Sequence, residues 1–132
     1  MILALETAGM TTRMRLFDQA KSPESGYHAE WESGRELSDY LLSHLNTFIE
    51  AHDHSLNDLS GIIIFSGPGS FTSLRIGHTT VNALADSLGI PVVGARGDAW
   101  LLDGLQALKT SQKTQIALPF YGAEANVTKP KS

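Results

Sequence analysis

The sequence lacks cysteine and long hydrophobic runs. Without cysteine, disulfide bonds, thiolate metal sites and cysteine nucleophiles are all excluded for this chain. No apolar run approaches the ~20 residues that cross a bilayer. The N-terminus also has no basic residue ahead of its apolar run, as a secretory signal would have. We therefore expect a cytoplasmic protein with no membrane segment.

Basic charge is also scarce. The 132 residues include 10 Lys and Arg against 14 Asp and Glu, which gives a net charge of −4. The only basic cluster is formed by Lys129 and Lys131, near the C-terminus. Affinity for a nucleic acid backbone comes mainly from neutralised phosphates, so a protein that binds it alone usually carries a basic stripe. The composition argues against tight, direct nucleic acid binding by this chain alone.

Hydrophobic patterning alternates between strands and helices. Short apolar or alternating runs predict strands at 1–5, 12–17, 27–31, 61–65 and 91–94, with a weaker candidate at 115–118. Helical spacing predicts helices at 35–52, 71–88 and 98–108. Hairpins followed by β-α-β crossovers indicate an α/β fold with a mixed five-stranded sheet and three helices. We divide the chain into one lobe, residues 1–118, and an irregular C-terminal tail, residues 119–132.

Two local motifs predict how the first two helices begin. Ser33 and Glu36 have the S-x-x-E spacing of a capping box for the first helix. Before the second helix, the string SGPGS forms a glycine-rich turn, in which Ser70 is placed to cap the helix. Such a turn can hold a phosphate, although this one lacks the Gly-Lys-Ser/Thr of a Walker loop. A tight turn without a ligand is the simpler interpretation. The turn residues and the nearby cation are Gly67, Gly69, Ser70 and Arg75.

Four segments, in order, resemble one protein family. The string GPGSFTSLRIG, followed by ALADSLGIPVVG, is similar to the signature of the TsaB (YeaZ) family. The opening ILALETA, the helix LSDYLLSHLNTFI and the ending PFYGAEANVTKPK are similar to other segments of that family. The resemblance covers nearly the whole chain.

The resemblance implies a fold and a role. The fold would be a single actin-like, ribonuclease H-like lobe, without most of the second lobe that family members usually carry. The role would be that of a non-catalytic subunit that binds and activates TsaD, the transferase that makes N6-threonylcarbamoyladenosine (t6A) in tRNA. Further expected partners are a TsaE-like ATPase and tRNA, the latter only through the complex. The chain alone would bind no cofactor, and ATP or ADP would lie at the complex interface.

Family members bind TsaD through helices, which directs attention to the first two helices of this chain. Each has an apolar arc wider than one core-facing stripe needs, although both arcs could instead be buried within the monomer. The sequence does not tell which stripe faces the sheet. We assign the interface to Leu42, Leu45 and Ile49 on the first helix and to Ser73, Ile76, Thr80, Ala83 and Ser87 on the second. Without its partner, the chain is expected to form a homodimer through such stripes.

No residue pattern predicts catalysis or metal binding. The five histidines do not form an HxxxH or HExxH motif, and no catalytic residue is assigned. Two other functions stay open: a small ATP-binding enzyme of actin-like fold, and a homodimeric interaction module unrelated to tRNA. Nucleotide hydrolysis by the isolated chain would favour the first. Failure to bind a TsaD-like protein would favour the second.

Overall fold

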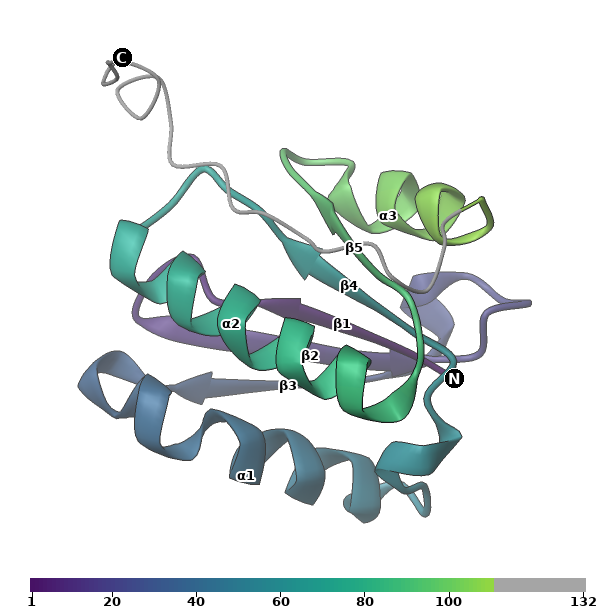
Figure 1. The fold of residues 1–132 in the computed structure, drawn as a ribbon, viewed down its shortest axis with the longest axis horizontal. Coiled ribbons are helices and arrows are strands. Elements are labelled where there is room, and N and C mark those ends of the chain that lie inside the picture. The colour runs from purple at the N-terminus through teal and green to yellow at the C-terminus, as the bar shows by residue number, and fades with distance from the viewer. Residues whose placement is uncertain (111–132) are drawn as a thin grey trace.

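A mixed five-stranded sheet forms the centre of the molecule. The computed structural model describes residues 1–110, in which the strand order is β3-β2-β1-β4-β5 (Figure 1). The strands are β1 (Ile2–Glu6), β2 (Thr11–Phe17), β3 (Tyr27–Glu32), β4 (Gly61–Phe65) and β5 (Val92–Ala95). The α-helices are α1 (Leu37–Ala51), α2 (Phe71–Leu88) and α3 (Trp100–Leu108). The predicted mixed sheet and three helices are therefore confirmed. The weaker strand candidate at 115–118 and the boundary between lobe and tail lie outside the described residues.

The direction of each strand follows from its connection. Short turns make β1 antiparallel to β2 and β2 antiparallel to β3. Helical crossovers make β1 parallel to β4 and β4 parallel to β5. All five residues of β4 are buried, as expected for an Ile-rich strand that is covered on both faces.

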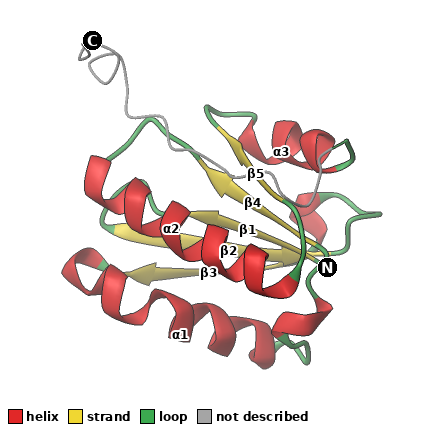
Figure 2. Ribbon diagram, in the orientation of Figure 1, coloured by secondary structure: helices red, strands yellow, loops and turns green. Residues whose placement is uncertain are grey.

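Helices cover both faces of the sheet, with α1 and α2 on one face and α3 on the other (Figure 2). The alternation of side chains along β1 separates the two cores. Leu3 and Leu5 join the larger core with α1 and α2, whereas Ile2 and Ala4 join the smaller core under α3. The larger core extends beneath most of the sheet, and the smaller one is confined to the part that α3 covers.

Two stacked pairs hold α1 over the edge strand β3. The rings of Trp31 and His44 lie 3.7 Å apart at an interplanar angle of 12°. The rings of Tyr27 and His52 lie 3.9 Å apart at 13°. His44 lies on α1 and His52, two turns later, is the C-cap residue of that helix, while Tyr27 and Trp31 share one face of β3. The stacking therefore aligns the helix along the strand.

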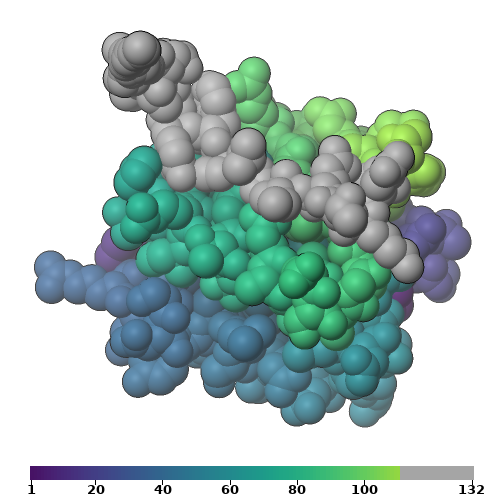
Figure 3. Space-filling model, in the orientation of Figure 1, coloured from purple at the N-terminus to yellow at the C-terminus, as the bar shows by residue number. Residues whose placement is uncertain are grey.

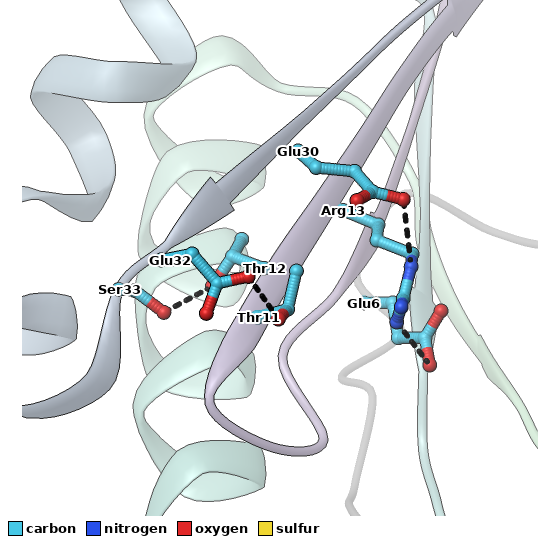
Figure 4. A network of polar contacts seen from close by, with 7 residues as sticks. All are labelled: Glu6, Thr11, Thr12, Arg13, Glu30, Glu32 and Ser33. Atoms are coloured by element: carbon cyan, nitrogen blue, oxygen red, sulfur yellow. Dashed lines mark hydrogen bonds and ion pairs between the residues drawn. The ribbon is translucent and has the colours of Figure 1, made fainter.

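The predicted capping box at the start of α1 is wrong. Residues Gly34–Glu36 form a single 3-10 turn before α1, and neither Ser33 nor Glu36 caps the helix through its side chain. The buried Ser33 hydroxyl instead lies 2.7 Å from the Thr12 hydroxyl (Figure 4). It also donates to the Met10 carbonyl. Since these partners occupy the hydroxyl, Ser33 joins the end of β3 to the start of β2 and does not cap α1.

Candidate partner-binding surface

A groove runs between the outward faces of α1 and α2. It has a volume of about 430 Å³ and lies on the side of the helices that faces away from the sheet. Figure 3 shows this face, where α1 and α2 lie side by side. The groove is lined by Ser38, Asp39 and Leu42 from α1 and by Thr79, Thr80, Ala83, Leu84 and Ser87 from α2.

Four of the eight predicted interface residues line this groove. Leu42 is 50% exposed, which is unusual for a leucine on a helix that packs on a sheet. On α2, the groove contains Thr80, Ala83 and Ser87. These side chains are small and uncharged, so another helix could approach closely. Ser73 and Ile76, also predicted, are half-buried and lie outside the groove lining.

Leu45 and Ile49 are not on the outward surface, which corrects their assignment to the interface. Both side chains are 0% exposed and belong to the core between α1 and the sheet. Leu45 follows Leu41 by four residues and therefore lies on the same, core-facing side of α1. The wide apolar arc on α1 is mostly core, and only Leu42 extends it to the surface.

Sequence reasoning missed four groove residues: Ser38, Asp39, Thr79 and Leu84. Ser38 precedes Leu42 by one turn of α1, so helical spacing from Leu42 could have found it. Leu84 lies on the other apolar face of the second helix, is only 9% exposed and belongs to the core, but it also lines the groove. The same spacing relates Asp39 to Leu42, three residues on, and Thr79 to Ala83, four residues on, so it could have found these two as well.

The glycine-rich turn joins the start of α2 to the turn between β1 and β2. The Ser70 hydroxyl accepts from the Ser73 amide at 3.4 Å, so Ser70 caps α2 as predicted. The Ser70 amide donates to the Ala8 carbonyl at 2.8 Å. A side chain at Gly69 would overlap Ala8, so this close approach requires glycine. Gly67 has a φ of 119°, which also favours glycine.

Arg75 is exposed on the first turns of α2. Its guanidinium carbon lies 5.7 Å from the centre of the Phe71 ring, in a cation–π contact. The turn and Arg75 thus have structural roles that need no ligand. A bound phosphate at this turn stays a prediction.

A buried histidine fixes α2 against the end of β4. His78 is 2% exposed and Ser66 is 5% exposed. His78 Nδ1 lies 2.7 Å from the Leu74 carbonyl, which can only accept, so this nitrogen carries the proton. His78 Nε2 therefore accepts from the Ser66 hydroxyl at 3.0 Å. Burial lowers the pKa of His78 below its usual 6.5, because the charged ring would lose its hydration.

This shift predicts a pH dependence of stability. In the unfolded chain His78 titrates near its ordinary pKa, so below about pH 6.5 the unfolded state binds more protons than the folded state. The contribution of neutral His78 to the free energy of unfolding should be fully present above this pH. The free energy of unfolding should fall by up to about 1 kcal/mol as the pH drops from 7.5 to 5.5. Urea unfolding at several pH values measures the change. A His78→Gln variant should lose this component, and an unchanged slope in that variant would contradict the assignment.

The described residues contain no group of three or more His, Asp or Glu side chains that could hold a metal ion. No helix within residues 1–110 combines the length and apolar character that crossing a membrane requires.

Comparison with sequence families identifies a related enzyme. The model of the family described as "TsaD: tRNA N6-adenosine threonylcarbamoyltransferase" matches residues 24–104, more than half of the chain. The tRNA N6-adenosine threonylcarbamoyltransferases of two Tropheryma whipplei strains, Twist and TW08/27, are 33% identical over 93 residues. That match covers 70% of this chain and 21% of theirs. The tRNA threonylcarbamoyladenosine biosynthesis protein TsaB of Bacillus subtilis (strain 168) is 50% identical over 40 residues, 30% of this chain and 18% of its own.

Solved structures share the fold. YeaZ from Pseudomonas aeruginosa has a TM-score of 0.65 at 24% identity, covering 82% of this chain and 48% of its own. A structure titled as a protein similar to peptidase YEAZ, from the same organism, has a TM-score of 0.66 at 24% identity, covering 82% of this chain and 47% of its own. The expected actin-like, ribonuclease H-like lobe is thereby confirmed.

The chain spans about a fifth of the length of its curated relatives and about half that of the solved neighbours. The matches nevertheless agree on one group of proteins, concerned with threonylcarbamoyladenosine in tRNA. The chain therefore belongs to the TsaD family, and the resemblance to TsaB (YeaZ) that its sequence shows is confirmed.

Proposed function

We propose that this chain is a non-catalytic partner subunit in t6A modification of tRNA, which binds a TsaD-like transferase and activates it. The observation that carries the proposal is the groove between α1 and α2. It is the larger of the two surface hollows that we describe, and it coincides with half of the interface residues predicted from the sequence.

The groove has the properties of a helix-binding surface. Leu42 and Leu84 supply apolar contact, and Ala83 leaves room for a neighbouring helix. Amphipathic helices commonly bind in grooves of this kind through residues spaced three or four apart. Asp39 adds a single negative charge to the lining, which favours a partner helix with a basic residue near this point.

The chemistry of the described residues supports a role without catalysis. The only buried histidine, His78, is hydrogen bonded at both ring nitrogens, so neither is available to a substrate. The Glu6 carboxylate lies 3.8 Å from Arg13 in an ion pair.

The test is association with the TsaD-like protein of the same organism. The full chain should form a complex of defined mass by light scattering and should raise transferase activity. Ala83→Arg should abolish both effects, because a charged side chain would fill the groove and lose water on binding. Ala51→Arg makes the same change at an exposed residue at the far end of α1, and it should leave the complex intact.

Wild-type association by the Ala83→Arg variant would show that the groove is not the interface. Failure of the unaltered chain to bind would favour the homodimeric interaction module. Calorimetric titration of the isolated chain with ATP tests the remaining rival, since tight binding with hydrolysis would indicate an enzyme. The TsaE-like ATPase, the homodimer in isolation, the indirect contact with tRNA and the nucleotide at the complex interface stay predictions.

A further inference from the structure

A second hollow lies on the opposite face of the sheet, beside α3. It has a volume of about 120 Å³. Ala4 of β1 and Arg15 of β2 form its floor, Trp100 and Leu101 of α3 form one wall, and His28 and Glu30 of β3 form the other. None of these residues belongs to the groove between α1 and α2.

The hollow exists because α3 covers only part of this face. Gly104 brings α3 close to β4, where a side chain would overlap Ile63. The helix packs on β4 and β5, and the Trp100 ring contacts Phe65 of β4 edge-on at 5.5 Å. On β1, Ala4 lines the hollow together with Trp100. No helix within residues 1–110 covers the corresponding face of β2 and β3. At the centre of β1, Ala4 is too small to fill the space.

Of the two arginines that line the hollow, Arg13 forms ion pairs within the described part of the chain and Arg15 does not. Arg13 lies between two carboxylates, at 3.8 Å from Glu6 and 3.2 Å from Glu30 (Figure 4). Arg15 is half-buried, and no ion pair joins it to another residue of the described range. A half-buried guanidinium without a counter-charge is an attractive position for an anion.

The strand register places polar groups around this guanidinium. Arg15 pairs with Ala4 on β1 and with His28 on β3, so the arginine lies between the open floor and an imidazole. The Glu6–Arg13–Glu30 network occupies the adjacent row of the same face. Its two carboxylates share one cation, so this network leaves one negative charge in excess, which weakens the attraction of Arg15 for any anion without cancelling it.

We propose that this hollow binds a small monocarboxylate. The guanidinium of Arg15 would hold the carboxylate in a bidentate pair, and a ring nitrogen of His28 would donate to it. Trp100 and Leu101 would contact the apolar end of the ligand. A cavity of ~150 Å³ can hold benzene, so the volume here suits a ligand of about four to six non-hydrogen atoms. The proposal does not depend on the function proposed for the groove.

The test uses propionate and its neutral analogue propionamide, with the full chain and amide-resolved NMR. Propionate should give saturable shifts centred on Arg15 and His28, and propionamide of nearly the same shape should give none. Inorganic phosphate should bind more weakly than propionate, because it has no apolar end to contact Trp100 and Leu101. Equal shifts with propionamide, or tighter binding of phosphate, would overturn the proposal.

Two variants test separately whether binding needs the charge of Arg15 and the open volume of the hollow. Arg15→Gln should weaken propionate binding at least about tenfold by removing a charged hydrogen-bonding partner. Ala4→Val keeps the charge but adds two methyl groups to the floor, and it should also abolish binding. Arg35→Gln removes an exposed arginine that is not part of the hollow and should leave binding unchanged. Retained affinity in both Arg15→Gln and Ala4→Val, each with a well-dispersed spectrum, would contradict the site.

Discussion

Leu45→Glu is expected to unfold the chain even without denaturant. The side chain is completely buried between α1 and the sheet. Truncating a buried leucine to alanine costs about 2–5 kcal/mol, and placing a carboxyl group in the same apolar space costs more. The sum reaches or exceeds about 5 kcal/mol, which is the lower end of the stability of natural domains. Circular dichroism and amide spectra of the purified variant measure the outcome.

Leu42→Glu is the matched control, with the same change three residues earlier on the same helix. Leu42 is half exposed in the groove, so this variant should fold with a change in stability within about 0.5 kcal/mol. It should nevertheless lose the association proposed for the groove. If Leu45→Glu folds as well as Leu42→Glu, the orientation of α1 described here is wrong.

Gly77→Ala is expected to destabilise the fold by about 1–3 kcal/mol. A β-carbon at this position of α2 would overlap the side chain of Thr7, at the end of β1. Thr7 cannot easily move, because it is 0% exposed and its hydroxyl donates to the Ser73 carbonyl at 2.9 Å. The usual gain of about 1 kcal/mol from replacing glycine by alanine in a helix should therefore be reversed. Urea unfolding measures the difference.

A double-mutant cycle identifies the cause of that effect. Thr7→Ala removes the two nearest atoms that the new β-carbon would meet, Oγ1 and Cγ2, at the cost of the Thr7 hydrogen bond, and leaves only the Thr7 β-carbon at 3.1 Å. In the Thr7→Ala background, Gly77→Ala should become neutral or stabilising, so the two changes should show a favourable coupling. Additive effects would mean that the contact between β1 and α2 is not the reason for glycine at this position.

The sequence predicted the elements of the fold well because their signals are local. The Ile-rich run of β4 indicated a covered central strand, and all five of its residues are buried. Ser70 and Gly89 mark the two ends of α2, the first as an N-terminal cap and the second as a left-handed C-terminal cap with a φ of 69°. The capping box at α1 failed, because a competing hydroxyl, that of Thr12, comes from another strand.

The candidate surface could be predicted only in part. On α2, helical spacing placed Leu74 and Val81 on a different face from Ala83 and Ser87, but only the structure shows that the first face is the core and the second the groove. On α1, apolar residues occupy both the core side and the groove side, so spacing alone could not separate Leu45 from Leu42. The hollow beside α3 was not predictable at all. It depends on how far the helix extends across the sheet, which is set by packing between residues distant in the chain.

The central position of β1 affects the folding of the chain during its synthesis as well as the native structure. One side of β1 pairs with β2, which follows almost at once, but the other side pairs with β4, which is translated only after β2, β3 and α1. A growing polypeptide therefore displays an unpaired, apolar strand edge at the ribosome until residues 61–65 emerge. Chaperones that cover this edge until β4 is available would therefore be expected to raise the yield of native protein.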